Sequence, residues 1–376
     1  MKKILKFTEP SFIGNEEEYI LQVLKGLRLS GDGYFTNKCH DWFRENTVVK
    51  KPLLTTSCTH ALEMIAMLIN IEDGDEVIMP SFTFTSTANA FVLRGAKIVF
   101  VDIRPDTMNI DENKIENAIT SKTKAIVPVH YAGVVCEMDK IISIARKYNL
   151  FVIEDAAHAL ASTYKERFSG TIGDFGVYSF HDTKNITSGE GGLLLVNNEK
   201  FNQRSEVIRE KGTNRGQFFR GEVEKYEWKD IGSSYLPSEL NAAILFAQLE
   251  KIEELQEIRY SLYERYYKEL KNLTNKVELP NVTSRDDHNA HMFYIKCKDL
   301  EERTNLIGFL KEDGIYAAFH YIPLHTSTAG KIFGRFDGLD EYTTIESERI
   351  LRLPFHANML DDDVLRVVSK VKEFYG

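Results

Sequence analysis

Residues 175–196 read FGVYSFHDTKNITSGEGGLLLV, in which two apolar runs, 175–180 and 192–196, flank a polar loop that ends in glycines. Similar apolar runs precede them at residues 52–56, 76–79, 98–102, 125–129 and 151–155. Amphipathic stretches such as MDKIISIARKY at 138–148 separate most of these runs. Strands that are apolar almost throughout and alternate with helices form a sheet that is covered on both faces. The sequence therefore predicts a large α/β domain whose mostly parallel, seven-stranded sheet is flanked by helices.

The pattern changes after residue 236. A helical stretch at 237–273 begins with Pro237, at a position where a missing N–H costs little. A continuous helix of about 36 residues would be roughly 54 Å long, and such a helix often carries the chain into a second domain. Strand-like residues 292–297 and a helical run at 301–312 follow. We expect a large domain over residues 1–236 and a smaller α+β domain over residues 237–376.

Composition narrows the class of protein. The formal net charge of −9 argues against binding to nucleic acid or to an anionic membrane, because both favour a basic surface. The four cysteines are widely spaced and form no CxxC pair, so we expect reduced thiols and no metal site. The N-terminal MKKILK is not followed by an apolar run, and no long apolar stretch occurs elsewhere. We therefore expect a cytoplasmic protein without a membrane span.

Small hydroxyl residues follow the first apolar run. Ser57, Cys58 and Thr59 open the next helical pattern, at the strand end where open α/β sheets bind their ligands. A helix N-terminus has free N–H groups and a partial positive charge, which suit a phosphate. Ordinary capping of the helix by Ser57 or Thr59 is the alternative interpretation.

A second strand end has an acidic residue. The run 151–155 ends in Glu154 and Asp155, and His158 follows three residues later. A carboxylate at the end of a buried strand needs a partner, and the protonated ring nitrogen of a cofactor is one candidate. A structural ion pair or a helix cap would also satisfy it. His158 either lies beside such a cofactor or is a histidine of the core.

Lys184 lies on the glycine-ended loop that follows the run 175–180. A lysine amine forms a Schiff base where its surroundings favour the neutral form, whereas an exposed lysine is only solvated. Phe84, after the run 76–79, could stack on a ring or belong to the core. Three strand ends, in chain order, thus present a phosphate site, a carboxylate and an amine. Pyridoxal 5′-phosphate (PLP) requires these three groups together.

Longer stretches carry a family resemblance. They include SCTHALEM (57–64), EDAAHA (154–159), SFHDTKN (179–185), EKGTNRGQFFRG (210–221), DIGSSYLPSELNAA (230–243), NAHMFYIK (289–296), FHYIPLH (319–325) and YTTIESERILRLP (342–354). In these stretches the chain resembles the DegT/DnrJ/EryC1/StrS sugar-nucleotide aminotransferases, which are fold-type I PLP enzymes. The likeness covers nearly the whole chain and is greatest to members that make dTDP-4-amino-4,6-dideoxygalactose for enterobacterial surface polysaccharides.

The resemblance implies a role for each matching residue. Lys184 would hold PLP as a Schiff base, Asp155 would pair with the pyridine nitrogen, and Phe84 would stack on the ring. The cofactor phosphate would contact Ser57, Cys58, Thr59 and Ser179. The sugar nucleotide would contact Asp32, Tyr321 and His325. Members of the family work as homodimers with shared active sites, so we expect a homodimer.

The chain departs from the family pattern in three places. His158 stands where the family usually has Gln, next to the cofactor, and could donate to the phenolic oxygen of PLP. Ser234 stands where many members have an Asn that reaches the phosphate in the neighbouring subunit. The loop 187–192 is one residue shorter than in similar members, which could change the substrate side of the pocket.

The implied reaction moves the amino group of L-glutamate to the C4 ketone of dTDP-4-dehydro-6-deoxy-D-glucose. The products would be dTDP-4-amino-4,6-dideoxy-D-galactose and 2-oxoglutarate, in the biosynthesis of O-antigen or enterobacterial common antigen in lipopolysaccharide-bearing cells. The C4 epimer, with the gluco configuration, is the alternative product. A sugar dehydratase is less favoured because related dehydratases carry His in place of Lys184. A non-catalytic PLP-binding regulator would not need the set formed by Lys184, Asp155 and Phe84.

Overall fold

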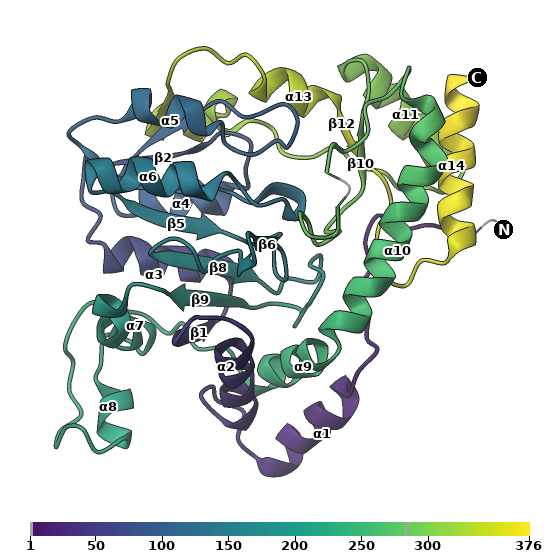
Figure 1. The fold of residues 1–376 in the computed structure, drawn as a ribbon. Coiled ribbons are helices and arrows are strands. Elements are labelled where there is room, and N and C mark those ends of the chain that lie inside the picture. The colour runs from purple at the N-terminus through teal and green to yellow at the C-terminus, as the bar shows by residue number, and fades with distance from the viewer. Residues whose placement is uncertain (1–2, 283) are drawn as a thin grey trace.

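The computed structural model describes residues 3–282 and 284–376 (Figure 1). Its centre is a sheet with the strand order β1-β9-β8-β5-β4-β2-β3-β11. The bounds of these strands are β1 Lys51–Thr55, β2 Glu76–Pro80, β3 Lys97–Val101, β4 Thr123–Ile126, β5 Phe151–Asp155, β8 Phe175–Ser179, β9 Gly192–Val196 and β11 Gly334–Phe336. Among the described strands of this sheet, β9 alone runs antiparallel to its neighbours. The prediction of a mostly parallel α/β fold is confirmed.

The predicted number of seven strands is wrong by one. The eighth strand, β11, pairs in parallel with β3, in the register Gly334 to Ile98 and Phe336 to Phe100. Its three residues, Gly-Arg-Phe, have no apolar run that would mark a strand. The C-terminal part of the chain thus adds an edge strand to the large sheet.

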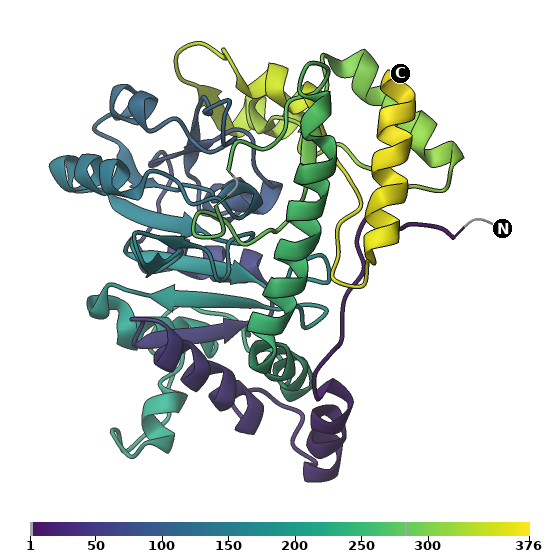
Figure 2. The same ribbon diagram turned by 45° about the vertical axis from the view of Figure 1, so that its right-hand side comes forward.

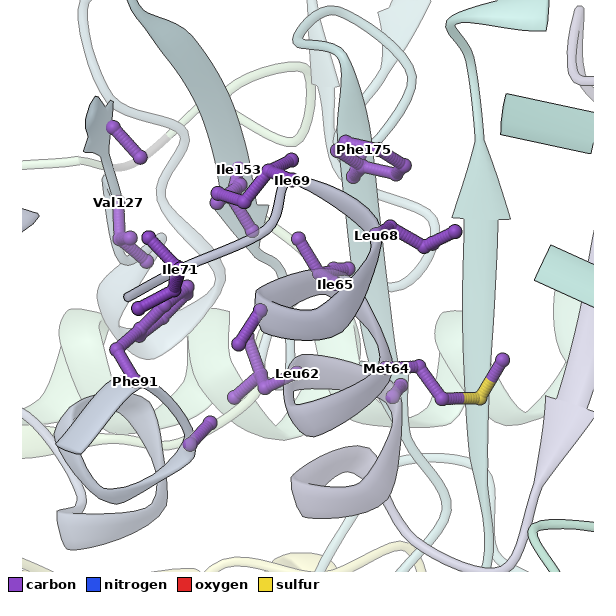
Figure 3. Close-up of a cluster of buried hydrophobic side chains, with 14 of the residues drawn as sticks. Leu62, Met64, Ile65, Leu68, Ile69, Ile71, Phe91, Val127, Ile153 and Phe175 are labelled. Carbon is purple, nitrogen blue, oxygen red and sulfur yellow. The ribbon is translucent and has the colours of Figure 1, made fainter. Parts of the chain in front are cut away.

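Alternating side chains on the strands pack against helices on both faces of the sheet. On one face, α3 (Cys58–Leu68) packs Leu62, Ile65 and Leu68 against the sheet (Figure 3). Their partners in this cluster include Val127, Ile153 and Phe175. The same face is covered by α4 (Thr85–Val92) and α7 (Asn202–Arg209). Burial of such apolar side chains stabilises the layer by about 1.5–3 kcal/mol for each one.

The opposite face is covered in two halves. Over β2 to β5 lie α5 (Glu112–Ala118) and α6 (Met138–Tyr148), and α6 has the bounds that its amphipathic pattern predicts. Over β1, β8 and β9 lie α1 (Glu16–Gly26), α2 (Tyr34–Asn46) and α9 (Glu239–Glu250) (Figure 1). The buried carboxylate of Glu239 accepts hydrogen bonds from the backbone N–H groups of Gly33, Phe35 and Thr36. This contact fixes the start of α2 on α9.

The prediction of one continuous helix over 237–273 is wrong. The helix breaks at Lys251, whose φ of −111° and ψ of 12° are not helical, and α10 (Ile252–Leu270) then leaves in a new direction. The two helices serve different cores, which explains the break. Leu245 and Leu249 of α9 pack under the large sheet, whereas Tyr266 and Leu270 of α10 pack in a separate C-terminal cluster.

The C-terminal cluster lies among α10, α11 (Leu300–Glu312) and α14 (Asp361–Tyr375), with the strand pair β10 (Tyr294–Lys296) and β12 (Ile350–Arg352). Helices α10 and α14 run side by side (Figure 2). The remaining short elements are β6 Thr163–Tyr164, β7 Arg167–Phe168, α8 Arg215–Phe219, α12 Thr328–Phe333, α13 Thr343–Arg349, and the 3-10 turns η1 Tyr131–Gly133, η2 Glu199–Phe201, η3 Lys271–Leu273 and η4 Leu324–Thr326. Because β11 rejoins the large sheet, a domain division at residues 236 and 237 remains a proposal. In the part of the chain that the structure describes, no helix combines the length and apolar character needed to cross a membrane.

Candidate active site

A cavity of about 480 Å³ opens at the carboxyl ends of the strands, between the large sheet and the C-terminal part of the chain. The predicted residues that line it are Ser57, Cys58, Thr59, Phe84, Asp155, His158, Ser179, Lys184 and Tyr321. They come from the ends of β1, β2, β5 and β8 and from one C-terminal segment. Ligands of open α/β sheets bind at this edge, so the topology by itself brings these distant residues together.

One wall of the cavity is the N-terminus of α3. The hydroxyl of Ser57 caps the helix by accepting a hydrogen bond from the backbone N–H of His60, at 3.1 Å. The N–H groups of Cys58 and Thr59 have no partner among the described residues. A Cβ on Gly192 would lie 2.3 Å from the nitrogen of Cys58, so only glycine lets this helix end pack against β9. Ser57 can therefore cap α3 while the helix end still binds an anion, because the N–H groups of Cys58 and Thr59 stay free.

The acid of the second strand end faces the cavity. Asp155 is 5% exposed, and its Oδ2 accepts a 2.7 Å hydrogen bond from the hydroxyl of Thr87. The N–H of Ala157 donates to Oδ1 at 3.2 Å. Thr87 in turn lies 2.9 Å from the hydroxyl of Thr83. No cation forms an ion pair with Asp155 in the described chain, so a buried carboxylate is held in place without a countercharge.

Lys184 lies on the loop after β8 and extends into the cavity. Burial lowers the pKa of its amine to about 8, against the opposing effects of Cys58 and Asp155. The backbone N–H of Lys184 donates to the carbonyl of His181 at 3.0 Å. The next residue, Asn185, is held from the C-terminal side through the carbonyl of Asn289 and the ring of His291. Both halves of the chain thus hold the loop that carries Lys184, and burial brings the pKa of its amine closer to neutral pH.

His158 is 7% exposed and lies between two other cavity residues. Its ring stacks on His291, with 4.3 Å between the centroids, and its Nε2 lies 3.2 Å from the hydroxyl of Tyr321. Its Nδ1 is buried and has no hydrogen-bond partner. Burial holds the pKa of His158 well below its usual range, with a further lowering by the charge of Lys184. The imidazole is therefore neutral at neutral pH and leaves one ring nitrogen for a ligand.

Phe84 and Ser179 lie at the edge of the cavity. Phe84 precedes the first turn of α4 and is 57% exposed, with its ring 6.2 Å from the ring of Tyr321. An aromatic ring that is so exposed does not contribute to a core. Ser179, the last residue of β8, receives a 3.4 Å contact from the N–H of His181. The structure thus favours a ligand contact for Phe84 over the core position that its sequence pattern left open.

Three predicted residues lie outside the lining of this cavity. His325 lies 2.7 Å from the hydroxyl of Ser81 and 3.1 Å from a carboxylate oxygen of Asp340, so both ring nitrogens are engaged. Asp32 forms a 2.8 Å ion pair with the buried Arg209. Ser234 is exposed and forms an isolated bridge with Glu210. Within one chain, therefore, these residues do not meet the other nine, and their roles stay predictions.

Several lining residues were not predicted from the sequence. They are Phe7, Thr87, His291, His320 and Arg352. Arg352 and His291 belong to two of the stretches that carry the family resemblance, but neither follows a strand of the large sheet. Thr87 stands in a helical pattern as one of several hydroxyl residues, and nothing in that pattern distinguishes it from its neighbours.

The cavity fits PLP by its chemistry. The free N–H groups of Cys58 and Thr59 suit a phosphate, and Asp155 suits a protonated ring nitrogen. The amine of Lys184 suits an aldehyde, and the unpartnered Nδ1 of His158 suits a polar substituent on the ring. Each functional group of this cofactor therefore has one matching group in the cavity.

Known proteins resemble this chain over nearly its whole length. An uncharacterized protein of Methanocaldococcus jannaschii is 40% identical over 369 residues, which cover 96% of this chain and 95% of that protein. The GDP-perosamine synthase of Caulobacter vibrioides is 32% identical over 367 residues, with 97% and 96% covered. The model of the DegT/DnrJ/EryC1/StrS aminotransferase family matches residues 10–372.

Solved structures have the same fold. PseC of Helicobacter pylori, an aminotransferase of pseudoaminic acid biosynthesis, superposes with a TM-score of 0.90 at 26% identity and covers 99% of both chains. The sugar-aminotransferase-like protein Spr1654 of Streptococcus pneumoniae, solved in PLP and PMP forms, has a TM-score of 0.88 at 26% identity, with 99% of this chain and 98% of that chain covered. The chain therefore belongs to the DegT/DnrJ/EryC1/StrS aminotransferase family and works with PLP as its cofactor.

Proposed function

We propose that this aminotransferase moves the amino group of L-glutamate to the C4 ketone of dTDP-4-dehydro-6-deoxy-D-glucose. The product is dTDP-4-amino-4,6-dideoxy-D-galactose, a precursor of surface polysaccharide. The observation that carries the proposal is the position of Lys184 in one cavity with Asp155 and the N-terminus of α3. The nucleotide sugar rests on the family resemblance of the sequence.

A GDP-linked keto sugar is the second candidate substrate. The C. vibrioides relative is named for GDP-perosamine, and it shares 32% identity with this chain over nearly its full length. The reaction at the keto carbon is the same for both nucleotides, so the residues nearest the amine of Lys184 are compatible with either one. Substrate tests must therefore include both.

Lys184 is the residue that moves the proton. At pH 7 an amine with a pKa of about 8 is neutral in roughly one-tenth of the molecules, against about one in three thousand for a lysine in water. A neutral amine in the cavity can take a proton from the Cα of the amino donor and return it at the neighbouring carbon of the cofactor. Burial lowers the pKa toward the working pH, where such a base is most effective.

The other cavity residues would hold PLP and orient it toward Lys184. When bound, PLP supplies an electron sink that stabilises negative charge on the Cα of the donor. Asp155, positioned by Thr87, keeps the ring nitrogen protonated. The N–H groups at the start of α3 bind the phosphate, and Phe84 covers one face of the ring. His158 would donate to the ring substituent from Nδ1, which has no partner among the described residues, at the position where the family usually has glutamine.

We further propose that the active protein is a cytoplasmic homodimer. Ser234 is exposed, and the segment around α8 has a row of exposed aromatic side chains, which are Phe219, Tyr226 and Trp228. Exposed aromatic side chains in one segment are typical of a protein interface. This segment extends away from the body of the chain (Figure 1), where a second subunit could meet it.

One experiment tests the substrate assignment. Purified holoenzyme is mixed with L-glutamate, and the absorbance of bound PLP near about 410–430 nm must fall as nitrogen moves to the cofactor. The aminated protein is then given the dTDP- and the GDP-linked 4-keto-6-deoxy sugars, and recovery of the absorbance shows which one accepts the nitrogen. Proton NMR of the product gives the configuration at C4, because a small H3–H4 coupling indicates galacto and a large one gluco. Preferential use of the GDP sugar would replace the proposed substrate by the second candidate.

A further inference from the structure

The cavity has one guanidinium group. Within residues 3–282 and 284–376, Arg352 is the only arginine in the cavity lining, and Lys184 is the only lysine. Burial lowers the pKa of three of the four lining histidines, His158, His291 and His320, well below the usual range. An arginine stays protonated at any pH that a protein tolerates. Arg352 is therefore the fixed positive charge of the cavity.

The guanidinium of Arg352 is held in place but not neutralised. It donates from Nη2 to the carbonyl of Phe319 at 2.9 Å, and it lies 4.4 Å from the ring centroid of Phe7. Its Nε is buried without a hydrogen-bond partner, and no carboxylate of the described residues lies within ion-pair distance. A guanidinium that is fixed and unpaired in this way is prepared for an anion.

Arg349, one turn earlier in the chain, is a useful contrast. It forms ion pairs with Glu346 and Glu278, and its Nε donates to the carbonyl of Cys297 at 2.9 Å. Those contacts neutralise the charge of Arg349 and pair its Nε within the protein, as is typical of a structural arginine. Arg352 has no comparable set, although Arg349 directly precedes the short strand β12 and Arg352 is its last residue.

Arg352 lines the same cavity as Lys184 and the N-terminus of α3. Its charge lowers the pKa of Lys184 and of His158, so it is within electrostatic reach of both. Cys58, at the start of α3, also acts electrostatically on Lys184. The amine of Lys184 therefore shares the cavity with a helix end that suits a phosphate and with a guanidinium that has no assigned ligand.

We propose that Arg352 binds a carboxylate of the amino-acid donor and thereby orients the donor's nitrogen toward the cofactor at Lys184. This inference rests on the proposed function, because it requires an amino acid as donor. Every α-amino acid carries a carboxylate two bonds from its nitrogen, so a carboxylate site must lie near the reacting amine. The planar fork of a guanidinium matches two carboxylate oxygens, and Phe7 and the Phe319 carbonyl fix the plane of the fork.

The two half-reactions separate this site from a site for the sugar nucleotide. In rapid mixing, R352Q holoenzyme requires about 30-fold more L-glutamate than the wild type for half of the maximal rate, as expected when charge-assisted hydrogen bonds are lost. In the second half-reaction, the aminated R352Q protein uses the keto sugar nucleotide at the wild-type concentration, within about twofold. R352K, which keeps the charge but loses the fork, recovers part of the glutamate affinity.

R349Q is the matched control, because Arg349 lies three residues away and does not line the cavity. Its glutamate requirement stays within about twofold of the wild type. Wild-type dependence on glutamate in R352Q would overturn the inference, and so would a defect that appears with the sugar nucleotide instead. The absorbance of bound PLP, unchanged in all three variants, shows that the cavity is intact.

A binding measurement that involves no turnover tests the role of Arg352 separately from the proposed function. Succinate, a dicarboxylate that cannot donate nitrogen, is titrated into holoenzyme by calorimetry. R352Q must bind it at least about tenfold more weakly than the wild type. Equal affinity would overturn the inference even if glutamate is the donor. Absorbance that does not change when wild-type enzyme meets glutamate would instead contradict the proposed function.

Discussion

Glu154 and Asp155 are neighbours on β5, yet their carboxylates lie on opposite faces of the strand and have different partners. Glu154 accepts hydrogen bonds from the backbone N–H groups of Gly170, Ile172 and Gly173 and also contacts the ring of His130; all four contacts lie between 2.6 and 3.0 Å. Asp155 faces the cavity with only hydroxyl and N–H neighbours. The alternation of side chains along a strand thus divides one acidic pair into a structural residue and a residue that faces the cavity.

This division predicts opposite phenotypes for two amide variants. D155N leaves thermal unfolding close to that of the wild type and lowers kcat/KM at least about 100-fold, because the ring nitrogen loses its charged partner. E154Q places an NH₂ group among N–H donors, so the free energy of unfolding falls by about 1–3 kcal/mol while kcat changes little. Thermal melts and steady-state kinetics of both proteins test this. A larger kinetic defect in E154Q than in D155N would contradict the assignment.

The lowered pKa of Lys184 predicts how the apoenzyme takes up PLP. Only the neutral amine attacks the aldehyde, so the rate of covalent attachment rises with pH and becomes constant above the pKa of about 8. A lysine with the ordinary pKa of 10.5 would still gain rate well beyond that point. Stopped-flow absorbance from about pH 6 to pH 10 measures the profile. A rate that continues to rise at about pH 9.5 would show that burial does not lower this pKa.

His158 is expected to shape the acidic side of the pH profile. Burial holds its pKa well below 6.5, and the charges of Lys184 and Arg352 face it, so it is neutral at pH 7 and gains a proton only in acid. H158Q should therefore have near wild-type activity at about pH 7.5 and should lose less activity than the wild type at about pH 5.5. The pH dependence of kcat/KM measures this. An identical acidic limb in both proteins would contradict a contribution of His158 to that limb.

A homodimer predicts a particle of twice the chain mass of 43.2 kDa in sedimentation equilibrium. W228D, which places a charge on the most exposed tryptophan of the α8 region, should weaken the dimer and the activity together. L339D is a control, because Leu339 is 72% exposed but lies in a different part of the chain. Full activity in a monomeric W228D protein would contradict a shared active site.

Much of the fold was predictable because its strands carry their own signal. The runs at 151–155 and 192–196 are strands with the predicted bounds, since near-continuous apolar residues mark a buried strand. The three residues of β11 have no such pattern, and their pairing with β3 depends on the position of the C-terminal chain. The break at Lys251 was also invisible, because Leu249, Glu250 and Ile252 are all compatible with a helix and only the two separate cores bend the chain.

The candidate site likewise combines residues that the sequence could place with residues that it could not. Residues that follow strands, such as Asp155 and Lys184, could be placed in one cavity, because parallel strands bring their ends to one edge. Arg352 and His291 come from C-terminal segments whose packing against this edge depends on tertiary contacts. For His325, the resemblance implied a substrate contact, but Ser81 and Asp340 engage both of its ring nitrogens, and no sequence pattern indicates such partners.

The central claim is that one amine, that of Lys184, receives PLP in this cavity. Holoenzyme is reduced with borohydride, digested, and analysed by mass spectrometry for the lysine that carries the pyridoxyl group. The label is expected on the peptide that contains Lys184 and on no other, and K184A should bind PLP without covalent attachment and lose activity by about 1,000-fold or more. Stable label on another lysine of the wild type, or normal turnover by K184A, would contradict the account.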